Sequence, residues 1–600
     1  MKFCDMAQSS PPTRTNPGVY ATATVRSRRA PRHHAPSRNH AKEEARAQLG
    51  SAAGKRLFSA ETACLPWSTA RRVQAAGGAL RPAVSDAHFG DDASVEFHPD
   101  VVAALDLPAA LTRLESQRGG FLPSSLASRA ARQAAGDFLP RFRVMLQSGI
   151  DLQPVDVVFA HRYGSGTRPV PDLSIEARLV VEALGKLLVD RLAVDADLLG
   201  LTAHIEPVPG QKLVFERRPV EEPKPAYVAT ADVASFYEYV DHDLLANEIV
   251  ELTGDHRLAA AVQGTMSELL GRGFGLPQGP HGSDVFASLY LSRVDRRLLR
   301  AGVAMERFND DYLLRAESVA RGRRDLAALE RSLRDVGLIL NHEKTQVLSA
   351  EQYEHGLVAY QELLEAAAID TIELPPGYTF DPDEFEDISF ETANEGIIEA
   401  AFERALDDEE EHRFAARQRM IDSALPYLAG FENVKPLERI GDLVESWPAH
   451  IRNVNLYLRR LIGTAHEQAV VEAVVAVLRS QPLALPWVQG WLIDVLARST
   501  KTDESFADWL TGVAFTSSAP WFVRGRALIA LAHTNVFAEQ DAVGELFEAA
   551  SAAARPDVIA AVQLAGTDWS DQFVATLAAG DLLLKEVAEI VRSEQVRSVL

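Results

Sequence analysis

Two segments that lie far apart in the sequence each place aspartate beside aromatic residues. Asp232 lies near the end of the apolar run 228–233, and Tyr237 follows it five residues later. Asp310 and Asp311 are adjacent, with a phenylalanine before them and a tyrosine after them. Adjacent acids near a core are costly unless a cation neutralises them, although acids on a loop are usually just solvated. The pattern favours a site for a hard cation such as Mg²⁺, which prefers oxygen ligands.

Two further segments could hold a substrate near these acids. Residues 275–280 are Gly-Leu-Pro-Gln-Gly-Pro, which predicts a turn before a helix. Glycine lets the backbone approach a flat ligand closely, and Gln278 offers both a donor and an acceptor; an ordinary Pro-Gly turn is the alternative. Residues 337–341 indicate the end of a helix and the start of a strand, which would carry Lys344 near the acids.

Apolar periodicity predicts the elements that must position these residues. Residues 173–192 and 318–336 have apolar positions at helical spacing. Residues 228–233 and 339–348 predict strands, and a tight turn between two strands would aim Asp310 into the site. Helices that alternate with short strands predict an α+β or α/β catalytic body.

In this order and spacing, the four segments resemble motifs A, B, C and D of reverse transcriptases, over about residues 232–345. Upstream, Arg168 and Arg178 resemble the basic pair of the family's fingertips. The resemblance implies an α+β fold, a right-hand polymerase with fingers and palm. It also implies an RNA-directed DNA polymerase, a nucleotidyltransferase whose partners are dNTPs and RNA or DNA.

The resemblance assigns a role to each motif residue. Asp232, Asp310 and Asp311 would be catalytic and, with the backbone carbonyl of Val233, would hold two Mg²⁺ ions; Mn²⁺ is a second ion that suits these ligands. Two ions roughly 3.5–4 Å apart stabilise the attacking and leaving oxygens of a displacement. The nucleotide-binding residues would be Arg168, Arg178, Phe236, Tyr237, Gln278, Gly279 and Lys344.

Some of these roles have alternatives. Tyr237 stands where the family places a steric gate against a ribose 2′-hydroxyl, and Phe236 beside it could instead belong to the core. The two arginines would grip the triphosphate, and Lys344 is either a proton donor to pyrophosphate or a surface lysine. Phe308 and Asn309 depart from the family pattern, which has tyrosine and a small or apolar residue there. The departure leaves metal binding intact and puts accuracy, and even dependence on a template, in question.

Composition and periodicity divide the chain into four predicted parts. Residues 1–90 are expected to form a disordered basic arm, 91–350 the fingers and palm, and 351–412 an acidic linker or thumb-like segment. Residues 413–600 predict an all-α, HEAT-like helical-repeat domain. An ordinary helical bundle is the alternative, because the sequence indicates an irregular period. These helices would cradle the nucleic-acid product, form homo-oligomers or serve as a general scaffold.

Composition also excludes other classes of protein. The two cysteines, Cys4 and Cys64, exclude a zinc ribbon, a disulfide framework and a cysteine nucleophile in the body of the chain. The net charge of −23 argues against a general nucleic-acid coat but not against a polymerase, which needs only a positive groove. No apolar run reaches the roughly 18–20 residues that span a bilayer, and no secretory signal is recognisable. A cytoplasmic protein without a membrane partner is expected.

The order of these parts, with helices after the palm, is similar to the abortive-infection and defence-associated bacterial reverse transcriptases, such as AbiK. That resemblance implies a role in stopping phage infection, and some members of the group make DNA without a template, primed from a protein hydroxyl. Two alternatives stay open. One is a reverse transcriptase that copies a dedicated partner RNA, retron-like or diversity-generating. The other is a catalytically silent RNA-binding scaffold, against which the intact acids speak.

Overall fold

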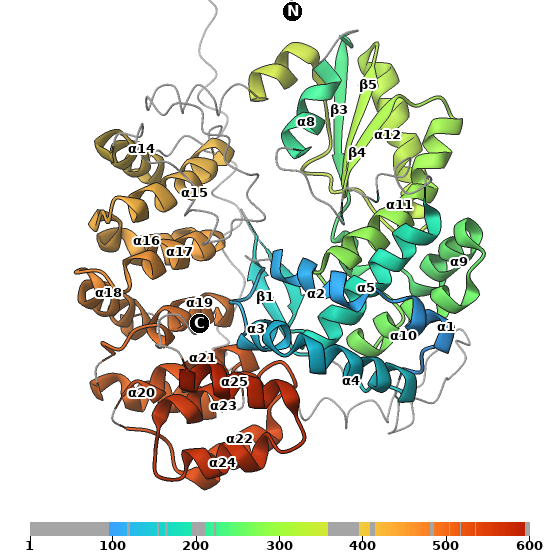
Figure 1. Ribbon diagram of the computed structural model, residues 1–600. Coiled ribbons are helices and arrows are strands. Elements are labelled where there is room, and N and C mark those ends of the chain that lie inside the picture. The colour runs from blue at the N-terminus through green and yellow to red at the C-terminus, as the bar shows by residue number, and fades with distance from the viewer. Residues whose placement is uncertain are drawn as a thin grey trace, which may run out of the picture. The chain divides into compact units, whose positions relative to one another are not determined.

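The computed structural model describes most of the chain between residues 95 and 593 (Figure 1). The predicted arm over 1–90 lies outside the described residues, as does much of the predicted acidic segment over 351–412. The described ranges are 95–116, 120–152, 155–162, 166–193, 201, 204, 211–220, 224–357, 395–407, 414–480, 485–502, 504–516, 518–534 and 536–593.

A four-stranded antiparallel sheet, in the order β4-β5-β3-β6, forms the palm. Its strands are β3 (Tyr227–Asp232), β4 (Met305–Phe308), β5 (Asp311–Ala316) and β6 (Gln346–Ser349). The predicted strand at 228–233 and the predicted strand pair around Asp310 are confirmed. The short strand expected within 339–348 is confirmed as β6; residues 342–344 before it form a turn, and Leu340 forms an isolated bridge to Val233.

Helices pack on the sheet and also form the fingers. Helix α12 (Val319–Arg334) begins where the Ser318 hydroxyl accepts a hydrogen bond from the Arg321 N–H, and it packs on β3 and β5. Helix α5 (Ile175–Leu192) is capped in the same way by Ser174 and is buried on nearly all sides, against α2 (Leu107–Ser116), α10 (His256–Leu270) and α11 (His281–Arg300). Both predicted helices, 173–192 and 318–336, are confirmed.

A two-stranded hairpin precedes helix α5 in the sequence. Strands β1 (Val157–His161) and β2 (Thr167–Pro171) pair in register from Val157 opposite Pro171 to His161 opposite Thr167. The other helices of this half of the chain are α1 (Pro99–Ala104), α3 (Leu126–Gln133), α4 (Ala135–Ser148), α8 (Gln211–Arg217) and α9 (His242–Thr253).

The C-terminal part contains only helices among its described residues, and they stack in pairs. Each of α15, α17, α19, α21 and α23 packs against the next one of this series, and α23 packs against α25. Their partners α16, α18, α20, α22 and α24 lie between them in sequence. The bounds are α14 (Glu395–Asp407), α15 (Phe414–Gly430), α16 (Ile440–Ser446), α17 (Ile451–Leu461), α18 (Glu467–Ser480), α19 (Pro486–Ala497), α20 (Ala507–Phe515), α21 (Trp521–Ala532), α22 (Gln540–Ala549), α23 (Arg555–Ala565), α24 (Ser570–Leu577) and α25 (Leu582–Ser593).

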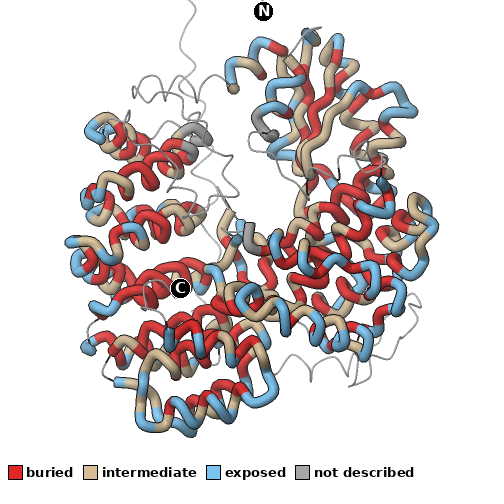
Figure 2. Tube along the Cα trace, in the orientation of Figure 1, coloured by how far each residue is buried: buried red, intermediate tan, exposed pale blue. Residues whose placement is uncertain are grey.

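The repeat is regular. Helices α15, α17, α19, α21 and α23 begin at residues 414, 451, 486, 521 and 555, a spacing of 34 to 37 residues. They form a continuous buried layer (Figure 2), in which α19 and α21 are buried almost throughout. The predicted fold class, an α+β polymerase body followed by an all-α helical-repeat domain, is confirmed, and the irregular period inferred from the sequence is wrong. None of the described helices is long and apolar enough to cross a bilayer.

Candidate active site

The backbone of the palm sheet brings the three aspartates together. Asp232 ends β3 and lies directly opposite Asp311, the first residue of β5. Asp310 precedes Asp311 in the turn after β4, and its carbonyl oxygen accepts a hydrogen bond from the N–H of Val233 at 3.2 Å. Residues on directly opposed positions of antiparallel strands have Cβ atoms about 4.5–5.5 Å apart, so this register makes Asp232 and Asp311 neighbours.

A buried arginine fixes the turn that carries Asp310. Asn309 has a left-handed backbone (φ +52°), and its carbonyl oxygen accepts a hydrogen bond from Arg307 Nη1 at 2.9 Å. Arg307 also donates through Nε to Asp295 Oδ2 at 2.8 Å and to the hydroxyl of Ser288 at 3.1 Å. The Tyr312 hydroxyl donates to the other oxygen of Asp295 at 3.0 Å. Helix α11 therefore holds the turn through Arg307 and Asp295, two residues that the sequence analysis missed.

The three acids repel one another at close quarters. Burial, followed by the charges of Asp311 and Asp232, raises the pKa of Asp310 from 3.8 to about 6. Two neighbours counter the charge of Asp232: Lys344 Nζ lies 3.1 Å from Oδ1, and Asn341 Nδ2 donates to Oδ2 at 2.9 Å. The structure thus brings Lys344 to the acids, as the sequence predicts, and adds Asn341.

The acidic side chains suit a divalent cation whose remaining ligands come from a substrate. The described residues include no group of three or more His, Cys, Asp or Glu side chains close enough to enclose a metal on their own. Mg²⁺, however, is usually bound by one or two carboxylates together with substrate phosphates. Burial and the charges of Asp311 and Asp232 raise the pKa of Asp310, so a cation bound here would relieve the repulsion between the acids. The acids therefore suit an ion that arrives with a phosphorylated ligand.

Tyr237 and Phe236 occupy different environments. The Tyr237 hydroxyl donates a hydrogen bond to Asp284 Oδ1 on α11, and burial together with the Asp284 charge raises the Tyr237 pKa well above its usual value. Burial also raises the pKa of Asp284 to about 7, with contributions from Glu182 and Asp310. The Phe236 ring, by contrast, is only 2% exposed and meets the Tyr237 ring edge-on. Phe236 therefore belongs to the core and is not placed to contact a nucleotide.

The predicted turn at 275–280 is tied to the segment that carries Tyr237. The Leu276 N–H donates to the Tyr237 carbonyl at 2.7 Å, and the Gly275 N–H donates to the Val240 carbonyl at 2.7 Å. Gly279 has φ +122°, a conformation that side chains rarely adopt, so a glycine is required there. Gln278 is buried beside it. The turn leads into α11, as the sequence predicts.

The two arginines assigned to the fingertip are separated by the fold. Arg168 lies on β2, its guanidinium 4.8 Å above the ring of Phe121, and its charge lowers the pKa of Tyr237 against the larger effects that raise it. Arg178 instead lies on α5, where Glu182 and Asp172 act on its charge. Arg178 lies outside the hairpin that carries Arg168, and its role as the second member of the basic pair stays a prediction.

The hairpin carries another arginine that the sequence analysis missed. Arg162 directly follows β1, and its Nη2 lies 3.8 Å from Glu238, the residue after Tyr237. The sequence could have indicated it, because Arg162 directly precedes the glycine-containing segment 163–166 and lies six residues before Arg168.

Comparison with known proteins gives one family. Residues 173–370 match the family described as "Reverse transcriptase (RNA-dependent DNA polymerase)". No curated protein matches the chain.

Similar solved structures include two telomerases. A telomerase from Candida albicans, in complex with a fragment of telomeric RNA, is 11% identical; the match covers 60% of this chain and 64% of that chain, with a TM-score of 0.28. An apo telomerase from Candida tropicalis is 12% identical; the match covers 73% of this chain and 68% of that chain, with a TM-score of 0.26. This chain therefore spans less than two thirds of the Candida albicans protein.

Proposed function

We propose that this chain, whose residues 173–370 form a reverse transcriptase domain, is an RNA-directed DNA polymerase that synthesises DNA from dNTPs with two Mg²⁺ ions. The family is one of nucleotidyltransferases. The observation that carries the proposal is the placement of Asp232 opposite Asp311, with Asp310 in the adjoining turn. Such a cluster of acids at the end of a palm sheet suits a reaction in which substrate and product are polyphosphates.

The protein's own groups would hold the reactants. Asp232, Asp310, Asp311 and the carbonyl of Val233 would bind the two ions, which supply charge stabilisation to the attacking and leaving oxygens; Mn²⁺ suits the same ligands. Lys344, which pairs with Asp232, would move to the pyrophosphate and donate a proton.

Other side chains would bind and select the nucleotide. Arg168 would grip the triphosphate, since arginine matches phosphate oxygens in charge and geometry, and Arg162 of the same hairpin would assist it. Tyr237 would exclude a ribose 2′-hydroxyl, held in place by Asp284. Gln278 and Gly279 would lie against the base pair that is being formed.

We further propose that the enzyme acts in antiphage defence, as a member of the abortive-infection group of bacterial reverse transcriptases. The support is the layout: an all-α stack of helices, α14 to α25, follows the palm in sequence. Synthesis without a template and priming from a protein hydroxyl are part of this proposal. A cytoplasmic location and homo-oligomers through the helical domain remain predictions.

A single assay tests the enzyme claim. Purified protein is incubated with Mg²⁺ and labelled deoxynucleotides, with and without primer–template, beside the double variant Asp310→Ala, Asp311→Ala. We expect product from the wild type only, with unchanged circular dichroism of the variant. Product from the variant would refute the site assignment.

The same assay separates the proposed modes of synthesis. Product that forms without added template, and stays bound to protein after denaturation and RNase treatment, supports untemplated, protein-primed synthesis. Strict dependence on an RNA template would instead favour the copying of a partner RNA. Absence of any product from the wild type would favour a silent RNA-binding scaffold.

A further inference from the structure

We infer that the C-terminal helical domain positions the nucleotide-gripping arginine of the fingers. Trp487 and Trp491 of α19 would act as positioning residues for Arg168, through the backbone and ring of Phe121. The inference rests on the proposed function, since it assigns Arg168 to the triphosphate. It gives the helical repeats an indirect part in substrate binding, through the position of Arg168.

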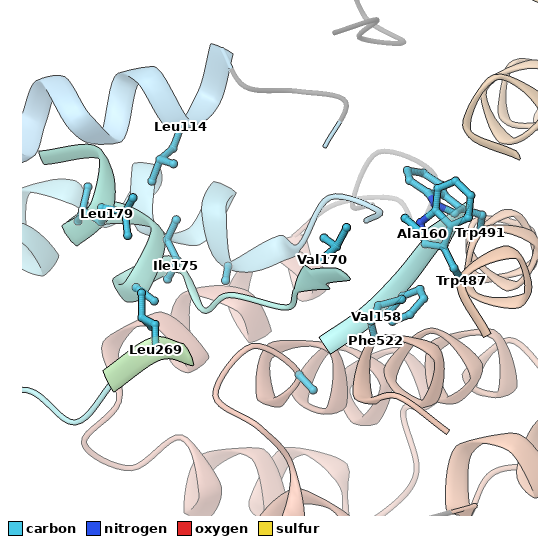
Figure 3. Close-up of a cluster of buried hydrophobic side chains, with 14 of the residues drawn as sticks. Leu114, Val158, Ala160, Val170, Ile175, Leu179, Leu269, Trp487, Trp491 and Phe522 are labelled. Atoms are coloured by element: carbon cyan, nitrogen blue, oxygen red, sulfur yellow. The ribbon is translucent and has the colours of Figure 1, made fainter. Parts of the chain in front are cut away.

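The contact begins on the β1–β2 hairpin. Helix α19 packs against β1, and Figure 3 shows both indole rings beside the strand at Ala160. The ring of His161 stacks on Trp487, with centroids 6.4 Å apart and an interplanar angle of 27°. Trp487 and Trp491 are 2% and 5% exposed, so this face of the hairpin is sealed from water.

Both tryptophans donate to one acceptor. Trp487 Nε1 lies 2.6 Å, and Trp491 Nε1 3.3 Å, from the carbonyl oxygen of Phe121. A carbonyl oxygen has two lone pairs and can accept both bonds. These two donors hold the Phe121 peptide, and the Phe121 ring in turn lies under the guanidinium of Arg168. A cation over an aromatic face is attracted to it, so the ring fixes one orientation of the arginine.

A second set of contacts anchors the base of the hairpin. The backbone N–H of Trp521, at the start of α21, donates to Asp156 Oδ2 at 3.1 Å. The Asp156 carbonyl accepts the N–H of Asp172 at 2.8 Å, which joins the two ends of the hairpin. Arg526 of α21 donates to the carbonyl of Ser124, three residues after Phe121. Both ends of the hairpin and the segment around Phe121 are therefore attached to the helical repeats.

The hairpin that carries Arg168 also approaches the proposed site. Arg162, which follows β1 in the same hairpin, lies 3.8 Å from Glu238, the residue after Tyr237, so the hairpin that carries Arg168 reaches the segment of the proposed sugar gate. A displaced Phe121 peptide would shift Arg168 relative to Tyr237 and the three acids. Because the shift would misplace a group that binds triphosphate, we expect it to weaken nucleotide affinity more than the rate of the bound complex.

The test is a pair of tryptophan substitutions that keep the rings and remove the donors. In the full-length protein, Trp487→Phe with Trp491→Phe should raise the Kd for dATP in Mg²⁺, and the KM for dATP, by about tenfold. The value of kcat should change less than twofold. In an Arg168→Ala background the same two substitutions should have no further effect, because the residue through which they act is gone.

Matched variants separate positioning from general damage. Trp569→Phe alters a tryptophan of the same domain that contacts Phe537 and Phe573, and it should leave dATP binding unchanged. Phe121→Leu removes the ring under Arg168 and keeps the carbonyl, so it should reproduce the loss of affinity. It also provides a test at a half-buried position if the double variant does not fold.

The outcomes are distinct. Wild-type affinity for dATP in both the double tryptophan variant and Phe121→Leu would overturn the inference and leave the proposed function standing. An equal loss in the Arg168→Ala background would also overturn it, because the tryptophans would then act by another route. If the wild type itself bound no dATP, the proposed function would be wrong, and the inference would fall with it.

Discussion

Replacing Asp310 by asparagine should make the metal-free protein more stable while it abolishes DNA synthesis. The carboxyl of Asp310 has its pKa raised from 3.8 to about 6, because the group is buried and faces Asp311 and Asp232. At about 1.4 kcal/mol for each pKa unit, the charged form costs the fold about 3 kcal/mol. Asparagine has nearly the same shape and no charge, so most of that cost should be removed.

The dependence on pH has a definite sign. A carboxyl that binds its proton more tightly in the folded chain than in the unfolded chain stabilises the fold on acidification. The unfavourable contribution of Asp310 should be absent below pH 4, grow between pH 4 and 6, and be complete above that. The stability difference between Asp310→Asn and wild type should therefore be large at pH 7.5 and small at pH 4.

Native-state hydrogen exchange of the β3 and β5 amides is the suitable assay, because it reports the opening free energy of the palm itself. Tryptophan fluorescence would not, since no tryptophan of the chain lies between residues 68 and 446. Millimolar Mg²⁺ should slow exchange in the wild type and not in the variant. Faster palm exchange in Asp310→Asn than in wild type at pH 7.5, without metal, would refute the electrostatic reasoning.

Four other substitutions test the residues that support the site. Arg307→Met should lower kcat and destabilise the palm by about 3–5 kcal/mol, because it leaves the largely buried Asp295 without its cationic partner. Denaturant unfolding measures the stability and steady-state assays measure kcat; an unchanged kcat would count against the role of Arg307 in holding the turn. Tyr237→Ala should admit ribonucleotides, whereas Asp284→Asn, which keeps an acceptor for the tyrosine hydroxyl, should largely preserve sugar selection. Competition between ATP and dATP measures the selectivity of each variant; equal selectivity of Tyr237→Ala and wild type would place the gate elsewhere. Gly282→Ala should destabilise the contact of α11 with α5 by more than 1 kcal/mol, because the added Cβ would lie 2.2 Å from a backbone oxygen of α5; an unchanged thermal midpoint would contradict this.

The chemistry of the site could be predicted from the sequence because it is encoded in short local patterns. Asp232 ends an apolar strand, Asp310 lies in the turn before β5 and Asp311 begins that strand. Their grouping was predicted from the resemblance of the ordered segments to the reverse transcriptase motifs. The groups that hold them could not be predicted in the same way. Arg307 is one of many arginines in the sequence, and only the fold shows that it faces Asp295 on α11.

Contacts between residues far apart in the sequence could not be predicted, for the same reason. Phe121 and Trp487 are 366 residues apart, and no local pattern relates them. The regular helical repeat was accessible in principle: a Pro-Trp pair occurs at 486–487 and again at 520–521, at the start of α19 and α21. Proline suits the first turn of a helix, so this pair marks equivalent positions of two repeats.

Two aspartates have pKa values that are shifted in opposite directions. Asp494, on α19, is fully buried, which would raise its pKa, yet Arg498 and Arg526 outweigh burial and lower the pKa to about 2. Its charge is compensated within the helical domain, which argues for a structural role. Asp310 is pushed in the opposite direction, because burial and two other acids act together and Lys344 offsets them only in part. Strongly perturbed acids without compensation are typical of functional sites. Bound divalent cations would correct the imbalance at Asp310, so the charge that raises the pKa of this carboxyl is also what would attract the cations that the triphosphate needs.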